Sequence, residues 1–129
     1  MKFKIIISAF VLSTLILAGI SIAANRKQDS SIVGTWISEK DHKWKMVFTA
    51  DNCIQYYDGT ITDKDYYFIA NTSPQCGQVV PIDNYTSYLK LVQVSSGKVQ
   101  ICYEINGITP KSLSLRPVDN GRIFVFDKQ

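Results

Sequence analysis

Hydrophobic and polar residues alternate with a period of two along most of the chain after residue 31. The segment 43–49 shows this clearly, because Trp44, Met46 and Phe48 share one side of an extended chain while lysine and threonine side chains take the other. Gly, Asn, Asp and Ser separate the segments of this kind. The pattern predicts eight β-strands, at about 32–39, 43–49, 53–57, 65–70, 87–94, 98–105, 112–116 and 122–126.

The connections between these strands are mostly short. Asp58-Gly59 is a strong hairpin signal, and Asn106-Gly107 and Asn120-Gly121 predict two further turns. The segment 71–84, with two prolines and a glycine, predicts the longest loop. A meander of eight strands closes on itself and so removes exposed edges. The expected fold class is therefore all-β, an eight-stranded antiparallel up-and-down barrel, whose interior is either filled by side chains or holds one small ligand.

The first two dozen residues follow a different pattern. Lys2 and Lys4 precede an apolar run over 5–22, and the small residues Ala23 and Ala24 come next. A basic start, an apolar middle and small residues at a cleavage site are typical of a secretory signal. We expect a signal peptide at 1–24, a flexible lead-in at 25–31 and one barrel domain at 32–129, in a periplasmic or secreted protein. The run is also about long enough to span a bilayer, so an uncleaved membrane anchor is the alternative.

Removal of that segment changes the charge of the chain. The whole sequence carries a net charge of +3, but without Lys2 and Lys4 it has 12 basic residues against 11 acidic ones. A protein that binds nucleic acid needs a basic stripe on its folded domain, and a nearly neutral domain does not predict one. We therefore expect no nucleic-acid partner, and a membrane partner only if the signal stays uncleaved.

Cysteine and histidine usage restricts the chemistry further. Cys53, Cys76 and Cys102 all lie in the barrel domain, so an oxidising compartment permits one disulfide in any of three pairings and one free thiol. The spacings fit no zinc pattern, and His42 is the only histidine. We expect a disulfide or buried thiols rather than a catalytic cysteine.

Motifs that carry catalysis are missing from the sequence. It has no glycine-rich phosphate loop, no H-E-x-x-H and no G-x-S-x-G. The acidic segment 58–65 lacks the residue order of a calcium loop, so we expect a solvated hairpin there. Asp63 and Asp65 fall on one face of an extended chain, as paired carboxylates would, but no third group converges on them in sequence. The expectation is a protein that is not an enzyme and needs no cofactor or metal.

Gly34-x-Trp36 stands at the start of the first predicted strand. In this feature the chain resembles the lipocalin family, in particular the small bacterial lipocalin-like domains, and the likeness extends over about 32–127. Further matching features are Phe48 before a turn and the segments 56–59, 66–69, 89–91, 103–105 and 113–115.

The resemblance implies a structural role for three residues. Trp36 would close one end of the barrel, under an arginine from a late strand, for which Arg116 or Arg122 would serve. Gly34 would allow another group to approach closely. Unlike typical members, the chain has a turn of three or four residues in place of the lid loop, and it ends right after the last strand. A filled barrel or a shallow open mouth is therefore expected at least as much as a lidded cavity.

Aromatic residues carry the two functional hypotheses. We expect inward-facing rings, which either fill the core or line a site for a small hydrophobic ligand. The candidate ligand-binding residues are Trp44, Phe48, Tyr56, Phe68 and Tyr103, with Tyr57 and Tyr67 on the opposite, exposed side. The alternative is a rigid barrel that docks or inhibits another exported protein through the 71–84 loop, pinned by a disulfide at Cys76.

Overall fold

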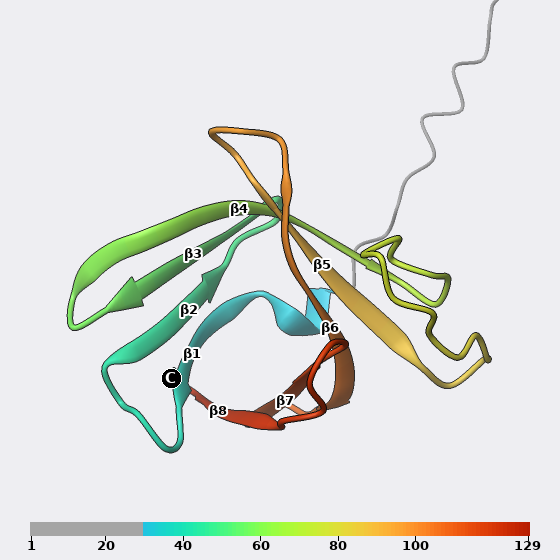
Figure 1. Cartoon of the computed structure of the whole chain (residues 1–129). Coiled ribbons are helices and arrows are strands. Elements are labelled where there is room, and N and C mark those ends of the chain that lie inside the picture. Colours follow the sequence, from blue (N-terminus) through green and yellow to red (C-terminus); the bar gives the residue numbers. More distant parts are fainter. Residues whose placement is uncertain (1–29) are drawn as a thin grey trace, which may run out of the picture.

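The structure, a computed structural model, describes residues 30–129, so the predicted signal segment lies outside the described residues. The described part is a closed barrel in which each strand pairs with the next in chain order (Figure 1). This confirms the predicted all-β, eight-stranded antiparallel barrel. Among residues 30–129, no helix is long and apolar enough to cross a membrane. The strands are β1 (Gly34–Ser38), β2 (Trp44–Phe48), β3 (Asn52–Tyr57), β4 (Thr60–Ala70), β5 (Ser87–Gln93), β6 (Val99–Ile108), β7 (Ser112–Pro117) and β8 (Phe124–Lys128).

The first and last strands close the barrel. β1 pairs with β8 in the register Trp36 to Lys128 and Ser38 to Phe126. One end of the barrel holds the short 3-10 helix η1 (Ser30–Ile32) and the long β4–β5 connection. We call this the η1 end, and the opposite end, where β2 begins, the Trp44 end. The residues between β4 and β5 form the 71–86 loop, which contains the predicted 71–84 segment.

Of the turns predicted from the sequence, the one at Asp58-Gly59 is present and the one at Asn106-Gly107 is not. Asp58 and Gly59 form a two-residue turn with φ of 50° and 78°, as a primed hairpin turn requires. The Asn106-Gly107 prediction is wrong, because β6 continues to Ile108 and the register shifts between Ile105 and Gly107. The glycine thus accompanies an irregularity inside the ladder, of the β-bulge type, rather than a hairpin.

A hydrophobic core fills the barrel. Trp36 and Phe126 are fully buried, and Trp44 packs edge-on against Phe124 and Phe126 with ring centroids 5.2 and 4.8 Å apart. The buried cluster consists of Ile32, Trp36, Met46, Phe48, Cys53, Tyr67, Leu89, Leu91, Tyr103, Leu113, Leu115 and Phe126. Large rings supply much of this buried surface, which is typical of a small domain that must gain stability from few residues.

The inward and outward faces of β4 are the reverse of those predicted from the sequence. Tyr67 is 2% exposed and lies in the core, whereas Phe68 is 37% exposed. Tyr67 can point inward because its hydroxyl donates to the carbonyl of Thr49 at 2.6 Å, so its polar tip is not left without a partner. Phe68 lies on the outer face beneath the ammonium group of Lys90, 5.4 Å from the ring centroid.

Tyr56 was also predicted to face inward, and the structure places it outside. Its register partner on β2 is Lys45, between the inward-facing Trp44 and the buried Met46. The Lys45 ammonium lies 4.5 Å from the centre of the Tyr56 ring. This contact covers the ring with a cation on the outer surface of the barrel.

Lys128, rather than Arg116, covers Trp36. The Lys128 ammonium lies 5.1 Å from the Trp36 ring centre, and Arg116 bonds Glu104, its register partner on β6. Gly34 (φ 143°) makes room for this lysine, because a Cβ there would lie 2.7 Å from Lys128 Cε. Trp36 Nε1 donates to the carbonyl of Ile32 at 2.8 Å and ties η1 to the barrel end. At this end of the barrel the cation over Trp36 is thus a lysine, and Gly34 is the residue that leaves space for it.

Candidate functional site

The five candidate ligand-binding residues do not meet at one place. Phe48 and Tyr103 lie in the core, and Trp44 is half-buried at the Trp44 end. Tyr56 and Phe68 lie on the outer surface. Whether the barrel binds a small hydrophobic ligand stays a prediction, but a site made of these five side chains is not assembled.

A depression of about 310 Å³ lies on the outside of the barrel. Its lining includes Ile37, Lys45 and Tyr56, which are register partners on β1, β2 and β3. Ile37 alternates with the buried Trp36 and Ser38, so this row faces outward. The depression is therefore not the mouth of the barrel interior.

The 71–86 loop is fixed to the barrel wall by a disulfide between Cys76 and Cys102. Cys102 lies on β6 between Ile101 and Tyr103, the two residues that contact the core, so its side chain faces outward. The expected anchor at Cys76 is confirmed, and Cys102 is the partner that the sequence left open. Cys53 is the remaining cysteine, free and buried.

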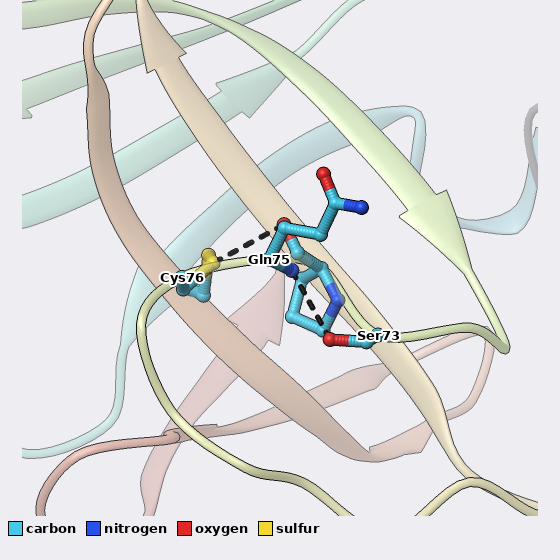
Figure 2. The surroundings of a disulfide bond; sticks show 5 residues. Ser73, Gln75 and Cys76 are labelled. Carbon is cyan, nitrogen blue, oxygen red and sulfur yellow. Dashed lines mark hydrogen bonds between the residues drawn. A yellow bond between two sulfur atoms is a disulfide. The ribbon is translucent and has the colours of Figure 1, made fainter.

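The chain turns sharply just before Cys76, as Figure 2 shows. Gln75 has a positive φ of 57°, and its backbone N–H donates to Ser73 Oγ at 3.3 Å. Cys76 Sγ lies 3.5 Å from the carbonyl oxygen of Pro74. A disulfide sulfur has no proton to donate, so this is a contact and not a hydrogen bond. Pro74 is buried, so this turn is partly covered as well as cross-linked to the barrel.

Hydrogen bonds hold the second half of the loop. The Tyr88 hydroxyl, from β5, donates to the carbonyl of Pro81 at 2.5 Å. Asp83 Oδ1 accepts the backbone N–H groups of Tyr85 and Thr86, at 2.8 and 2.7 Å. These bonds favour the ionised carboxylate and hold the pKa of Asp83 below its usual value. The loop is thus anchored to the barrel at Cys76 and Pro81, and Asp83 orders its last residues from within.

Between and beside these anchors the loop presents apolar side chains to solvent. Val79 is 104% exposed, Tyr85 is 94% exposed and Ile82 is 57% exposed. Within the described residues, the backbone groups of 77–80 have no hydrogen-bond partner. The loop therefore offers both unpaired main chain and three large exposed apolar side chains within seven residues, and exposed apolar surface is a feature of interaction sites.

A second feature lies inside the barrel, where polar side chains interrupt the core. Asp65 on β4 is fully buried, and neither of its carboxylate oxygens has a hydrogen-bond partner among residues 30–129. Its register partner on β3 is Cys53, and the buried Gln55 follows two residues along that strand. Gln55 Oε1 accepts a hydrogen bond from Trp44 Nε1 at 3.2 Å. The predicted solvated hairpin over 58–65 is therefore wrong at its last residue.

Burial has a direct effect on the ionisation of this group. Desolvation raises the pKa of Asp65, the side chain of Gln55 lowers it in part, and the charge of Asp63 raises it again. Asp63 is half-buried on the same face and accepts a hydrogen bond from Gln100 Nε2 at 2.8 Å. The paired carboxylates expected from the sequence do share a face. Among residues 30–129, Asp63 accepts a hydrogen bond from Gln100, whereas the Gln55 side chain acts on Asp65 without reaching hydrogen-bond distance.

The surroundings of Cys53 do not favour a nucleophilic thiol. Burial raises the pKa of this thiol, and the charges of Asp65 and Asp63 raise it further. A reactive cysteine needs the opposite, an electropositive and accessible setting. Among the described residues, no three His, Cys, Asp or Glu side chains come together as a metal site.

Two features of the site were not expected from the sequence. The partner of Cys76 depends on the path of the loop across β6, which period-two patterning does not report. The burial of Asp65 follows from the inward position of Tyr67, which hydropathy alone did not reveal. Comparison with known protein families, curated proteins and solved structures finds no match for this chain.

Proposed function

We propose that this chain is an exported binding protein whose barrel holds the 71–86 loop in a fixed shape for contact with another protein. The single observation that carries the proposal is a cross-linked loop that exposes Val79, Ile82 and Tyr85. A loop ordered in advance loses less conformational entropy when it binds, and this favours affinity.

The loop chemistry indicates the kind of partner. Residues 77–80 have backbone donors and acceptors that are unpaired within residues 30–129, so a partner can pair with them as it would with an additional strand. Val79 and Ile82 need apolar pockets, and Tyr85 brings a ring with a polar tip, a residue type enriched where binding energy concentrates. The expected partner is therefore a protein with an apolar cleft wide enough for an extended chain.

An oxidising compartment is consistent with this role. The disulfide between Cys76 and Cys102 persists outside the reducing cytosol, which supports the proposed export of the chain. The lipocalin-like assignment belongs to the same proposal. It is supported by the closed eight-stranded barrel, the Gly34-x-Trp36 pair and the cation over Trp36.

The test compares loop variants with a variant at a matched position. The tagged full chain is expressed in the organism that encodes it, as wild type, as Val79→Asp, as Ile82→Asp and as Ile61→Asp. Ile61 is the control, since it is 58% exposed but lies on β4 beside the hairpin at the Trp44 end. A partner that co-purifies with wild type and Ile61→Asp should be lost from both loop variants. If it co-purifies equally with all four proteins, or if no partner appears with wild type, the loop proposal fails.

A small-molecule role is the second candidate, and the observation that favours it is the polar group of Gln55 and Asp65 inside the barrel. Ligand sites are mostly apolar with a few well-placed polar groups, and this arrangement has that composition. Native mass spectrometry of gently purified protein tests it, since a retained ligand adds mass to the folded chain. A spectrum that contains only the mass of the chain would count against a tightly held ligand.

A further inference from the structure

Among residues 30–129, Asp65 is the group whose burial is hardest to explain by a contribution to stability. It is fully inside the barrel, and both carboxylate oxygens lack a partner among residues 30–129. A buried ionised group without a partner is destabilising, and native proteins rarely keep one without a use for it. A ligand that supplies the missing donor is a direct use.

The side chains that affect the ionisation of Asp65 are those of Gln55 and Asp63, and among residues 30–129 no cation contributes to it. The half-buried Asp63 adds a second carboxylate on the same strand face. The lysines that contact rings lie elsewhere, Lys45 and Lys90 on the outer face and Lys128 against Trp36. The electrostatic potential at this place in the barrel therefore favours a cation.

Rings lie between Asp65 and the Trp44 end. Trp44 contacts Phe124 and Phe126 edge-on, and its Nε1 donates to Gln55, the residue beside Asp65. Tyr103, on β6, is close enough for the charge of Asp65 to help raise the pKa of its hydroxyl, after the larger effect of burial. Aromatic faces bind organic cations as well as apolar groups.

From this juxtaposition we propose that the Trp44 end of the barrel binds a small organic amine, whose ammonium group donates to Asp65 and whose apolar body lies against Trp44 and Phe124. The proposal rests on the small-molecule candidate above and is independent of the 71–86 loop. No accessible surface reaches Asp65 in the structure, so the ligand enters by displacing Trp44 from Gln55. Trp44 is half-buried and holds this position by one side-chain hydrogen bond and its ring contacts.

The experiment uses three probes with one ring and different head groups: 2-phenylethylamine, 2-phenylethanol and phenylacetate. Binding to the full chain at pH 7 is followed by tryptophan fluorescence, because Trp44 must move, and by calorimetry. The amine should bind and change the emission, the alcohol should bind about tenfold more weakly or worse, and phenylacetate should not bind. Equal binding of amine and alcohol would overturn the ligand class, and binding of none of the three would overturn the site.

Variants separate Asp65 from general charge effects. Asp65→Asn should weaken amine binding by about tenfold or more, because the charged acceptor is lost. Asp119→Asn is the control, since Asp119 is an exposed acid in the β7–β8 connection at the same end. If Asp65→Asn does not fold, the amine should still raise the melting temperature of wild type more than the alcohol does. Amine affinity that is unchanged in a folded Asp65→Asn protein, or lost equally in Asp119→Asn, would contradict the proposal.

Discussion

Replacement of Asp65 by asparagine should make the protein more stable at neutral pH, although the residue is completely buried. Burial raises the pKa of Asp65 in the folded state, so the folded protein keeps its proton to a higher pH than the unfolded chain does. The stability contributed by this group is fully present below the unfolded pKa of about 3.9 and is lost as pH rises through the folded pKa. Asparagine has the same shape and does not ionise.

The size of the expected gain in stability follows from the hydrogen-bond partners that Asp65 lacks. A buried polar group without a hydrogen bond costs about 1–3 kcal/mol, and a charged one costs more until it takes up a proton. The variant should therefore gain about 1–3 kcal/mol over wild type at pH 7, after allowance for its own unpartnered amide. For a domain of about 100 residues, each kcal/mol corresponds to roughly 4–8 °C in melting temperature. The difference should grow with pH by at most about 1.4 kcal/mol per unit while one proton separates the two states.

Urea denaturation at several pH values from 4 to 8, followed by tryptophan fluorescence, measures this difference. Asp119→Asn serves as the control for the removal of one negative charge at an exposed position. Its stability should stay within about 0.5 kcal/mol of that of wild type, as is usual for an exposed substitution. The reasoning is refuted if Asp65→Asn is less stable than wild type by the same amount at every pH, because the carboxylate would then have a partner that asparagine cannot replace.

Four further variants probe the fold. Replacing Cys76 and Cys102 by serine should lower the free energy of unfolding by about 3.5 kcal/mol, since the cross-link closes a loop with a sequence separation of 26, and a loss below about 1 kcal/mol in urea denaturation would contradict this. Gly34→Ala should cost about 1–3 kcal/mol, because its φ is positive and a Cβ would meet Lys128; a melting temperature equal to that of wild type would argue against the close approach. Tyr67→Ala should cost about 3–5 kcal/mol and Phe68→Ala less than about 1 kcal/mol by the same assay, and the reverse order would mean that the orientation of β4 is incorrect.

The barrel itself could be predicted from the sequence because its signals are local. Alternation over 43–49 and the Asp58-Gly59 turn depend only on neighbouring residues, and both describe the structure correctly. Asn106-Gly107 is the exception, since the same dipeptide fits a turn or an irregular ladder, and pairing with β7 decides between them.

The inward and outward faces of β4 were harder to predict, because tyrosine and phenylalanine both suit a core. Tyr67 goes inward where the carbonyl of Thr49 is within reach of its hydroxyl, and Phe68 goes outward where Lys90 covers it. Both contacts join residues distant in sequence. Asp65 follows Tyr67 into the interior because side chains two residues apart on a strand share a face.

The candidate sites depend on such long-range contacts almost entirely. Cys76 could be proposed as an anchor from the sequence, but Cys102 as its partner required the path of the loop. Lys128 covers Trp36 because β8 closes the barrel against β1, whereas Arg116 is engaged by Glu104 on the outer face. The charge of a side chain was thus visible in the sequence, while the group it contacts was not.

Site-specific photocrosslinking tests the central claim, that the 71–86 loop is the surface that binds another protein. A photoreactive phenylalanine analogue replaces Val79 in one protein and Ile61 in a control, and both are irradiated in cells of the organism that encodes the chain. We expect a defined adduct with one exported protein from position 79 and no such adduct from position 61. The same adducts from both positions, or none from position 79, would contradict the claim.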